Sequence, residues 1–168
     1  MGRNLALERA APDFGFSVRA AEITDLPRIM AIERVAFDHP WSEESFMREF
    51  ALPFSRTSIA TVAKARRIIG YLCRWLVADE CHILNVAVDP KFRRTGIGSG
   101  LMAEVIAEAD LKGAAVITLE VRRSNLAARG LYRKLEFEER RLRRNYYGAG
   151  EDAIVMERQL KHSQNLKT

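Results

Sequence analysis

Apolar residues recur along this chain with two different periods, and the order of these periods predicts its elements. Every third or fourth position is apolar within residues 26–36, 43–50 and 97–112, which is typical of amphipathic helices, and a short helix is expected over 125–135. Runs rich in β-branched and aromatic residues favour strands at residues 16–20, 57–63, 68–77, 80–88, 115–121, 137–146 and 152–160. The pattern predicts an α/β fold, with one sheet of about seven strands and about four helices on its faces.

Short polar residues mark the expected helix starts, because their side chains accept hydrogen bonds from backbone N–H groups that the first turn leaves free. Thr24, Ser42 and Ser124 are the predicted caps of the first, second and fourth helices. The third helix is expected to end before Gly113. Short connections between the three strands that span residues 57–88 predict an antiparallel meander.

The same pattern predicts where the domain begins and ends. Residues 1–15 have no clear period and are expected to form a flexible leader, whereas the polar residues 161–168 are expected to be a frayed tail. Residues 16–160 then make one domain, which contains a short basic turn at residues 64–67. No repeat or linker divides it, and 168 residues are enough to bury a core.

Composition supports a soluble globular protein, with 48% hydrophobic and 29% charged residues. No apolar run approaches the roughly 20 residues of a membrane helix, and the N-terminus lacks the apolar segment of a secretory signal. A cytoplasmic location is therefore expected. Cys73 and Cys81 are predicted to be buried free thiols, although their neighbouring strands leave a disulfide open.

A net charge of +5 favours anionic partners. The densest basic cluster could contact acidic protein or ribosomal RNA, or it could be a solvated face neutralised by nearby carboxylates; it contains Arg140, Arg141, Arg143 and Arg144. Few aromatic residues lie among these arginines, so dedicated nucleic-acid binding is not expected. His39 and His82 have no third partner at metal-ligand spacing, and no metal is predicted.

The segment with the clearest chemistry joins the strand at 80–88 to the helix at 97–112 and reads Arg93-Arg94-Thr95-Gly96-Ile97-Gly98-Ser99-Gly100. A helix start offers free N–H groups and a partial positive charge, and glycines let the backbone approach an anion. Arg93 and Arg94 can add charged contacts. The segment therefore predicts a phosphate site, although a plain tight turn is also possible. Walker A and dinucleotide motifs are excluded, because no Gly-Lys-Ser/Thr follows and Leu101 stands where a glycine is needed.

Residues 93–98 resemble the Q/R-x-x-G-x-G/A motif of the GNAT family of N-acetyltransferases. Further segments resemble its RimI-type branch, the ribosomal-protein alanine N-acetyltransferases, in the same order along the chain: residues 39–42, 85–90, 119–125, 127–132 and 144–147. The resemblance implies a GNAT fold with a single mixed, mostly antiparallel sheet. It also implies that acetyl-CoA donates an acetyl group directly to a protein N-terminal amine in a ternary complex, without a metal. The acceptor would be the N-terminal alanine of a small-subunit ribosomal protein.

The same resemblance assigns the cofactor-binding residues. The strand backbone would hold the acetyl group and pantetheine, at Val86, Ala87 and Val88. The turn would hold the pyrophosphate, through Arg93, Arg94, Thr95, Gly96, Ile97, Gly98 and Ser99. Asn125 matches a further cofactor contact, and helix capping beside Ser124 is its other expected role.

Two residues are candidates for the chemistry. Strand alternation places Glu120 on the face of Thr118, and the resemblance makes it the general base; an ion pair with Arg122 or an arginine of 140–144 is the alternative. Partial burial near a cleft is expected to raise the pKa of Glu120. The resemblance also implies that Tyr132 protonates the leaving thiolate, whereas a lone helical tyrosine would otherwise belong to the core.

Three aromatic residues are expected at the peptide entrance: Trp41, Tyr146 and Tyr147. One position departs from the family pattern, because Glu136 replaces a glycine that would end the helix in a left-handed conformation. Glu136 in that conformation would cost about 1 kcal/mol, unless the turn differs. A lysine side chain or small amine as acceptor, or a non-catalytic regulator that binds acetyl-CoA, remain alternative functions.

Overall fold

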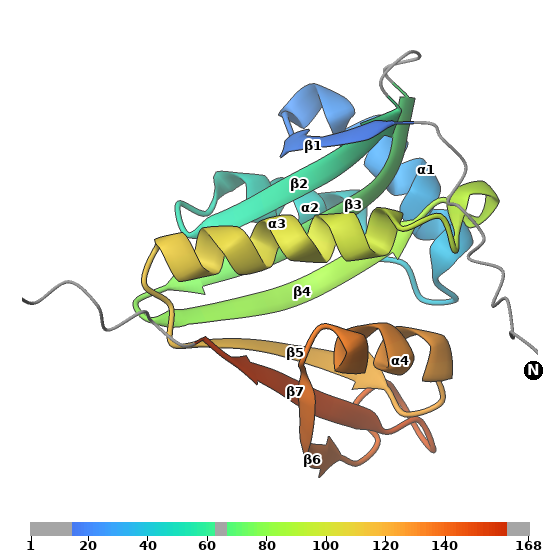
Figure 1. Ribbon diagram of the computed structural model, residues 1–168. Helices are drawn as coiled ribbons and strands as arrows, with labels where there is room; N and C mark the ends of the chain where they lie inside the picture. Colours follow the sequence, from blue (N-terminus) through green and yellow to red (C-terminus); the bar gives the residue numbers. More distant parts are fainter. Residues whose placement is uncertain (1–14, 63–66, 161–168) are drawn as a thin grey trace, which may run out of the picture.

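The computed structural model describes residues 15–62 and 67–160. One sheet has the order β1-β2-β3-β4-β5-β7-β6 (Figure 1). Its strands are β1 (Phe16–Ala20), β2 (Ser55–Val62), β3 (Arg67–Val77), β4 (Glu80–Val88), β5 (Val116–Arg122), β6 (Glu138–Arg143) and β7 (Ala153–Gln159). The helices are α1 (Leu26–Ala36), α2 (Glu43–Ala51), α3 (Ile97–Leu111) and α4 (Leu126–Lys134), with 3₁₀ turns at Ile23–Asp25 and Pro90–Phe92.

The predicted fold class is confirmed, including the antiparallel meander from β2 to β4. In the part of the chain that the structure describes, β4 and β5 form the one parallel pair of the sheet. The predicted leader, apart from Gly15, and the predicted tail lie outside the described residues, as do residues 64–66 of the predicted basic turn and residue 63 at the end of the strand predicted before it.

The sheet opens between β4 and β5. Parallel pairing runs only from Glu80 opposite Val116 to Ile83 opposite Leu119. Beyond that point β4 continues beside β3 and β5 continues beside β7, and Figure 1 shows the two strands diverging. An extra residue, Leu84, lies in β4 at a register shift against β3, and a bulge of this kind bends and twists a strand. The result is a gap in the ladder that exposes one side of the β4 backbone.

Two buried clusters hold the helices against the sheet. On one face α3 inserts Leu101, Met102 and Val105, whereas on the other α1 and α2 bury side chains such as Ile29 and Phe46 (Figure 1). Burying one such side chain stabilises the fold by about 1.5–3 kcal/mol. These contacts fix the start of α3 and the loop after α1 against the opening of the sheet.

The helix caps differ in part from the predictions. Ser42 caps α2 as predicted, because its hydroxyl accepts from the Ser45 N–H at 3.1 Å. Thr24 does not cap α1: a 3₁₀ turn precedes the helix and Asp25 stands at its cap position. Ser124 does not cap α4 either, since the neighbouring Asn125 side chain accepts from the Ala128 N–H at 3.1 Å.

Other local predictions can be checked directly. Cys73 and Cys81 are both buried free thiols, as predicted. Glu136 adopts the left-handed conformation expected from the glycine that it replaces, with a φ of 64°. The strand predicted over 137–146 is shorter, because β6 ends at Arg143. Within the described ranges, none of the helices has both the length and the apolar character needed to cross a membrane.

Candidate active site

A cavity of about 400 Å³ occupies the opening between β4 and β5. Its lining comes from α1 and the loop after it, from β4, β5 and α4, and from the segment between β6 and β7. Six of the predicted site residues share this lining: Trp41, Val86, Glu120, Asn125, Tyr132 and Tyr147. Segments far apart in the sequence therefore meet at one place.

The turn before α3 has free backbone donors. Gly96 caps the helix with a φ of 87°, a conformation that suits glycine. The first helical hydrogen bond runs from the Gly100 N–H to the Gly96 carbonyl at 2.9 Å. Among the described residues, the N–H groups of Ile97, Gly98 and Ser99 therefore have no backbone partner.

The side chains of the turn have separate roles. Arg93 and Arg94 are exposed and make no ion pair within the described chain. The Thr95 hydroxyl donates to the Phe92 carbonyl at 2.5 Å, so it closes the turn. A Cβ atom on Gly96 would meet nothing within 4 Å, which leaves this side of the turn open. Free N–H groups, open space and two unpaired guanidinium groups fit a diphosphate.

The third glycine of the segment serves packing. A Cβ atom on Gly100 would lie 2.4 Å from the Phe16 ring of β1. Real atoms do not approach so closely, so Gly100 is the residue that lets this aromatic ring pack on α3. The glycine-rich segment thus combines free backbone N–H groups with a contact to the first strand.

Glu120 lies on β5 with two polar partners. Its neighbours Leu119 and Val121 are buried on the other face, as the predicted alternation requires. One carboxylate oxygen lies 2.7 Å from His82 Nε2, and the other accepts from Arg143 at 2.8 Å. The predicted ion pair with an arginine of 140–144 therefore exists.

The expectation that the pKa of Glu120 is raised is wrong. The hydrogen bond with His82 lowers this pKa, burial opposes the effect, and the charges of His82 and Arg143 lower it further. Burial does not dominate because both carboxylate oxygens have partners that favour the ionised form. Glu120 is therefore an ionised carboxylate at neutral pH.

Tyr132 lies on α4 at the inner wall of the cavity. Only 5% of the residue is exposed, and its ring packs on Phe137 with 6.0 Å between the centroids. Burial raises the pKa of its phenol above the ordinary value, and the nearby Tyr147 adds to this effect. The phenol is therefore protonated at neutral pH and can donate.

The three predicted entrance residues have different places. Trp41 packs on Phe46, with 5.3 Å between the ring centroids, and lines the cavity. Tyr147 also lines the cavity, and the Cζ atom of Arg122 lies 4.5 Å from the centroid of its ring. Burial raises the pKa of the Tyr147 phenol to about 12. Tyr146 is 46% exposed, and its ring meets that of Tyr147 edge-to-face, with 5.0 Å between the centroids.

Sequence reasoning missed Glu33 of α1, a cavity residue that is only 1% exposed. Its carboxylate accepts from the Trp41 N–H at 2.7 Å, from the Asn85 amide at 3.2 Å and from the Tyr71 hydroxyl. The carboxylate thereby ties the loop after α1 to β3 and β4. A glutamate within the apolar stripe of the helix was the available signal, but its partners lie far away in the sequence.

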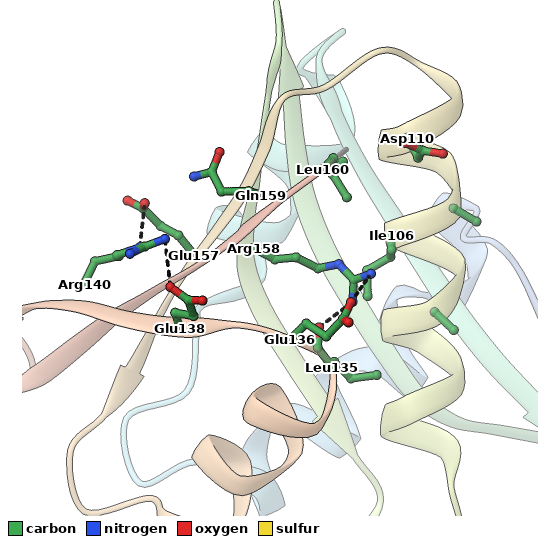
Figure 2. A pocket seen from close by; sticks show the side chains of 12 residues that line it. Ile106, Asp110, Leu135, Glu136, Glu138, Arg140, Glu157, Arg158, Gln159 and Leu160 are labelled. Atoms are coloured by element: carbon green, nitrogen blue, oxygen red, sulfur yellow. Dashed lines mark hydrogen bonds and ion pairs between the residues drawn. The ribbon is translucent and has the colours of Figure 1, made fainter. Parts of the chain in front are cut away.

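A second cavity, of about 710 Å³, lies between α3 and the end of β7 (Figure 2). Its arginines are paired locally: Arg140 lies 3.0 Å from Glu138, and Arg158 lies 2.9 Å from Glu136. None of the predicted site residues lines it. The larger cavity is therefore separate from the candidate site.

Comparison with known proteins agrees with this geometry. The model of the family described as acetyltransferase (GNAT) family matches residues 26–137. The chain is 39% identical over 146 residues to the [ribosomal protein bS18]-alanine N-acetyltransferase of Escherichia coli (strain K12), covering 83% of this chain and 95% of that protein.

Two further matches extend the comparison. A Bacillus subtilis (strain 168) protein named putative [ribosomal protein bS18]-alanine N-acetyltransferase is 33% identical over 141 residues, which cover 83% of this chain and 93% of that protein. The crystal structure of the ribosomal-protein-S18-alanine N-acetyltransferase from Escherichia coli superposes with a TM-score of 0.82 at 35% identity. That match covers 92% of this chain and all of the other.

Proposed function

This chain belongs to the acetyltransferase (GNAT) family, and from that premise we propose that it acetylates the N-terminal alanine of ribosomal protein bS18 with acetyl-CoA. One observation carries the proposal: six of the residues matched to this chemistry, among them Glu120 and Tyr132, line one cavity at the opening of the sheet. Relatives named for this reaction match nearly the whole domain. We infer a cytoplasmic location from the proposed ribosomal acceptor.

The donor would lie along the opening of the sheet. Its pyrophosphate accepts from the free N–H groups of residues 97–99, and Arg93 and Arg94 balance the charge. Its pantetheine arm follows the backbone of β4 from Leu84 to Val88, where pairing with β5 has ended. Strand N–H groups at Val86 and Val88 then polarise the acetyl carbonyl. The Asn125 side chain caps α4 through its Oδ1 atom, so its contact with the donor would use its Nδ2–H group.

The chemistry requires one proton to leave the amine and one to reach the sulfur. An α-amino group has a pKa of about 8 and is mostly protonated at neutral pH. Glu120 takes this proton, directly or through water, and the amine attacks the thioester carbonyl carbon. A C–N bond forms as the C–S bond breaks. The Tyr132 phenol donates to the departing thiolate.

The acceptor would enter between the loop after α1 and the segment before β7. Trp41 and Tyr147 form walls of the cavity on these two sides. Glu33 fixes the first wall through the Trp41 backbone, so its role is to position the entrance. An entrance lined by two aromatic side chains would favour an N-terminus with a small first side chain.

The decisive experiment mixes the protein with acetyl-CoA and a peptide that carries the bS18 N-terminal sequence beginning at alanine. Mass spectrometry is expected to show one added acetyl group, and fragmentation should locate it on the α-amine. A peptide with a blocked N-terminus and free lysines is the matched control. Acetylation of that control or of a polyamine, with the alanine peptide untouched, contradicts the proposal. Donor binding without any transfer would support a regulator instead.

A further inference from the structure

His82 lies directly behind the proposed base, outside the cavity. It belongs to β4 and pairs with Thr118 of β5, so its side chain shares a face with Glu120 two residues further along. Its Nε2 atom lies 2.7 Å from the Glu120 carboxylate. The Glu120 side chain is 10% exposed, whereas that of His82 is 35% exposed. The two side chains thus form a short polar path from the cavity lining to solvent.

We propose that His82 relays the amine proton from Glu120 to solvent, and so acts as a positioning and proton-relay residue for the reaction. This inference rests on the proposed function and on the role given there to Glu120. The acetyl-transfer chemistry itself uses no group beyond the cavity lining, which leaves His82 without another assignment.

Of the two partners of Glu120, only His82 can accept a proton. Arg143 contacts the other carboxylate oxygen at 2.8 Å, but a guanidinium is already protonated and has no acceptor atom. A neutral imidazole has one acceptor nitrogen and can therefore take a proton. The carboxylate between them therefore has one route by which it can lose a proton away from the cavity.

Neighbouring side chains hold the His82 ring in its orientation toward Glu120. The Trp75 ring of β3 meets the imidazole edge-on, with 6.2 Å between the centroids. Trp75 is in turn fixed by the hydrogen bond from its Nε1 to Glu49 of α2, at 2.7 Å. The charged groups that face this corner are therefore Glu120 from β5, Arg143 from β6 and Glu49 behind the indole.

The proton balance is simple. The amine gives one proton to the Glu120 carboxylate, which becomes a carboxylic acid. While Glu120 holds this proton, exchange with solvent moves the His82 proton from Nε2 to Nδ1. Nε2 then takes the proton from Glu120, leaving a carboxylate and an imidazolium. The imidazolium then releases its Nδ1 proton to water or buffer, which leaves the Nε2–H tautomer that donates to the ionised Glu120. Each turnover thus begins with Glu120 ionised.

The test measures kcat and KM in dilute buffer for the wild type, His82→Gln and His82→Ala. Glutamine keeps a hydrogen-bonding group near Glu120 but cannot relay a proton. Both variants are expected to lose about tenfold in kcat, with KM for donor and peptide nearly unchanged. Added imidazole should restore kcat in His82→Ala in proportion to its concentration, because a small buffer can replace the missing relay.

Arg143→Gln is the matched control, since it removes the other partner of Glu120 and should gain nothing from imidazole. Wild-type kcat in His82→Gln overturns the relay, and so does a loss in both variants that imidazole fails to restore. A wild-type enzyme that leaves the alanine peptide unmodified contradicts the proposed function instead. The relay is then measured in the same way with whichever amine the enzyme accepts.

Discussion

The two ends of the candidate site are built from different groups. The turn before α3 offers backbone N–H groups from consecutive residues, whereas the opposite end depends on side chains such as Glu120 and Glu33 from separate elements. A backbone site tolerates many side-chain changes but is sensitive to conformation. A side-chain site has the opposite sensitivity, because each group is placed by the packing of a different strand or helix. Substitutions at the two ends should therefore change different kinetic constants.

The largest effect is expected for Glu120→Gln, which keeps the shape of the side chain and removes its basic oxygen. The value of kcat should fall by about a hundredfold or more, as expected when a general base is lost. Steady-state assays with the alanine peptide measure the change. Glu139→Gln is a suitable control, because Glu139 also pairs with arginines but lies outside the cavity. Equal rates for the two variants would contradict the assignment of the base.

A substitution in the turn before α3 should change the KM for acetyl-CoA. In Gly96→Val a β-branched residue must adopt a φ of 87°, which costs about 1–2 kcal/mol or displaces the turn. We expect KM for acetyl-CoA to rise about tenfold, because a turn displaced to relieve this strain no longer presents its N–H groups to the pyrophosphate, with KM for the peptide little changed. Gly130→Ala in α4 is the control, since a Cβ atom there meets nothing within 4 Å. A higher peptide KM with an unaltered donor KM would contradict the place of the pyrophosphate.

A smaller effect is expected when the exposed charges of the turn are removed. Arg93→Gln combined with Arg94→Gln should raise KM for acetyl-CoA about fivefold in dilute salt, because charged contacts to phosphate are lost. The difference from wild type should shrink as salt is added, since exposed charges are screened. Arg34→Gln removes an exposed arginine of α1 and serves as the control. A donor KM that stays at the wild-type value in dilute salt would exclude these side chains from donor binding.

The smallest effect concerns pH. The pKa of Glu120 is lowered in the folded protein, so the base is ionised above that pKa and activity declines as the pH falls through it. Arg143→Gln removes one lowering charge, and the acid limb of the kcat/KM profile should therefore move to higher pH. The shift should be modest because Arg143 is 43% exposed. An acid limb that stays in place or moves to lower pH would show that Arg143 does not lower the pKa of Glu120.

The free energy of unfolding should also decrease as the pH falls, because the pKa of Glu120 is lowered in the folded protein. A carboxylate whose pKa is lowered on folding stabilises the protein above its unfolded pKa. This stabilisation is lost as the pH falls through the folded value, and chemical denaturation at several acidic pH values would measure it.

The conformation of the glycine turn before α3 could be predicted because its determinants are adjacent in the sequence. Gly96, the arginines before it and the helix after it form one continuous segment. Glu120 could be placed on the correct strand face from alternation alone. The direction of its pKa shift could not be predicted, because His82 lies 38 residues before it and Arg143 lies 23 residues after it.

The wrong helix caps have a similar cause. Ser124 and Asn125 are both good capping residues, and the choice between them depends on a contact distant in the sequence. The Ser124 hydroxyl lies 3.0 Å from Glu151, so it serves the segment before β7 and leaves the cap to Asn125. Capping preference alone limits the cap of α4 to these two neighbouring residues, and the tertiary contact with Glu151 decides between them.

The short parallel pairing of β4 and β5 has a consequence for the lifetime of the protein. The backbone hydrogen-bonding groups of a strand inside a sheet are normally paired with another strand. At the opening beside β4, the bound donor would pair with these groups instead. Donor binding then joins the two halves of the sheet, so the loaded protein should resist heat and proteases better than the free protein. Its turnover in the cell would thereby be linked to the supply of acetyl donor.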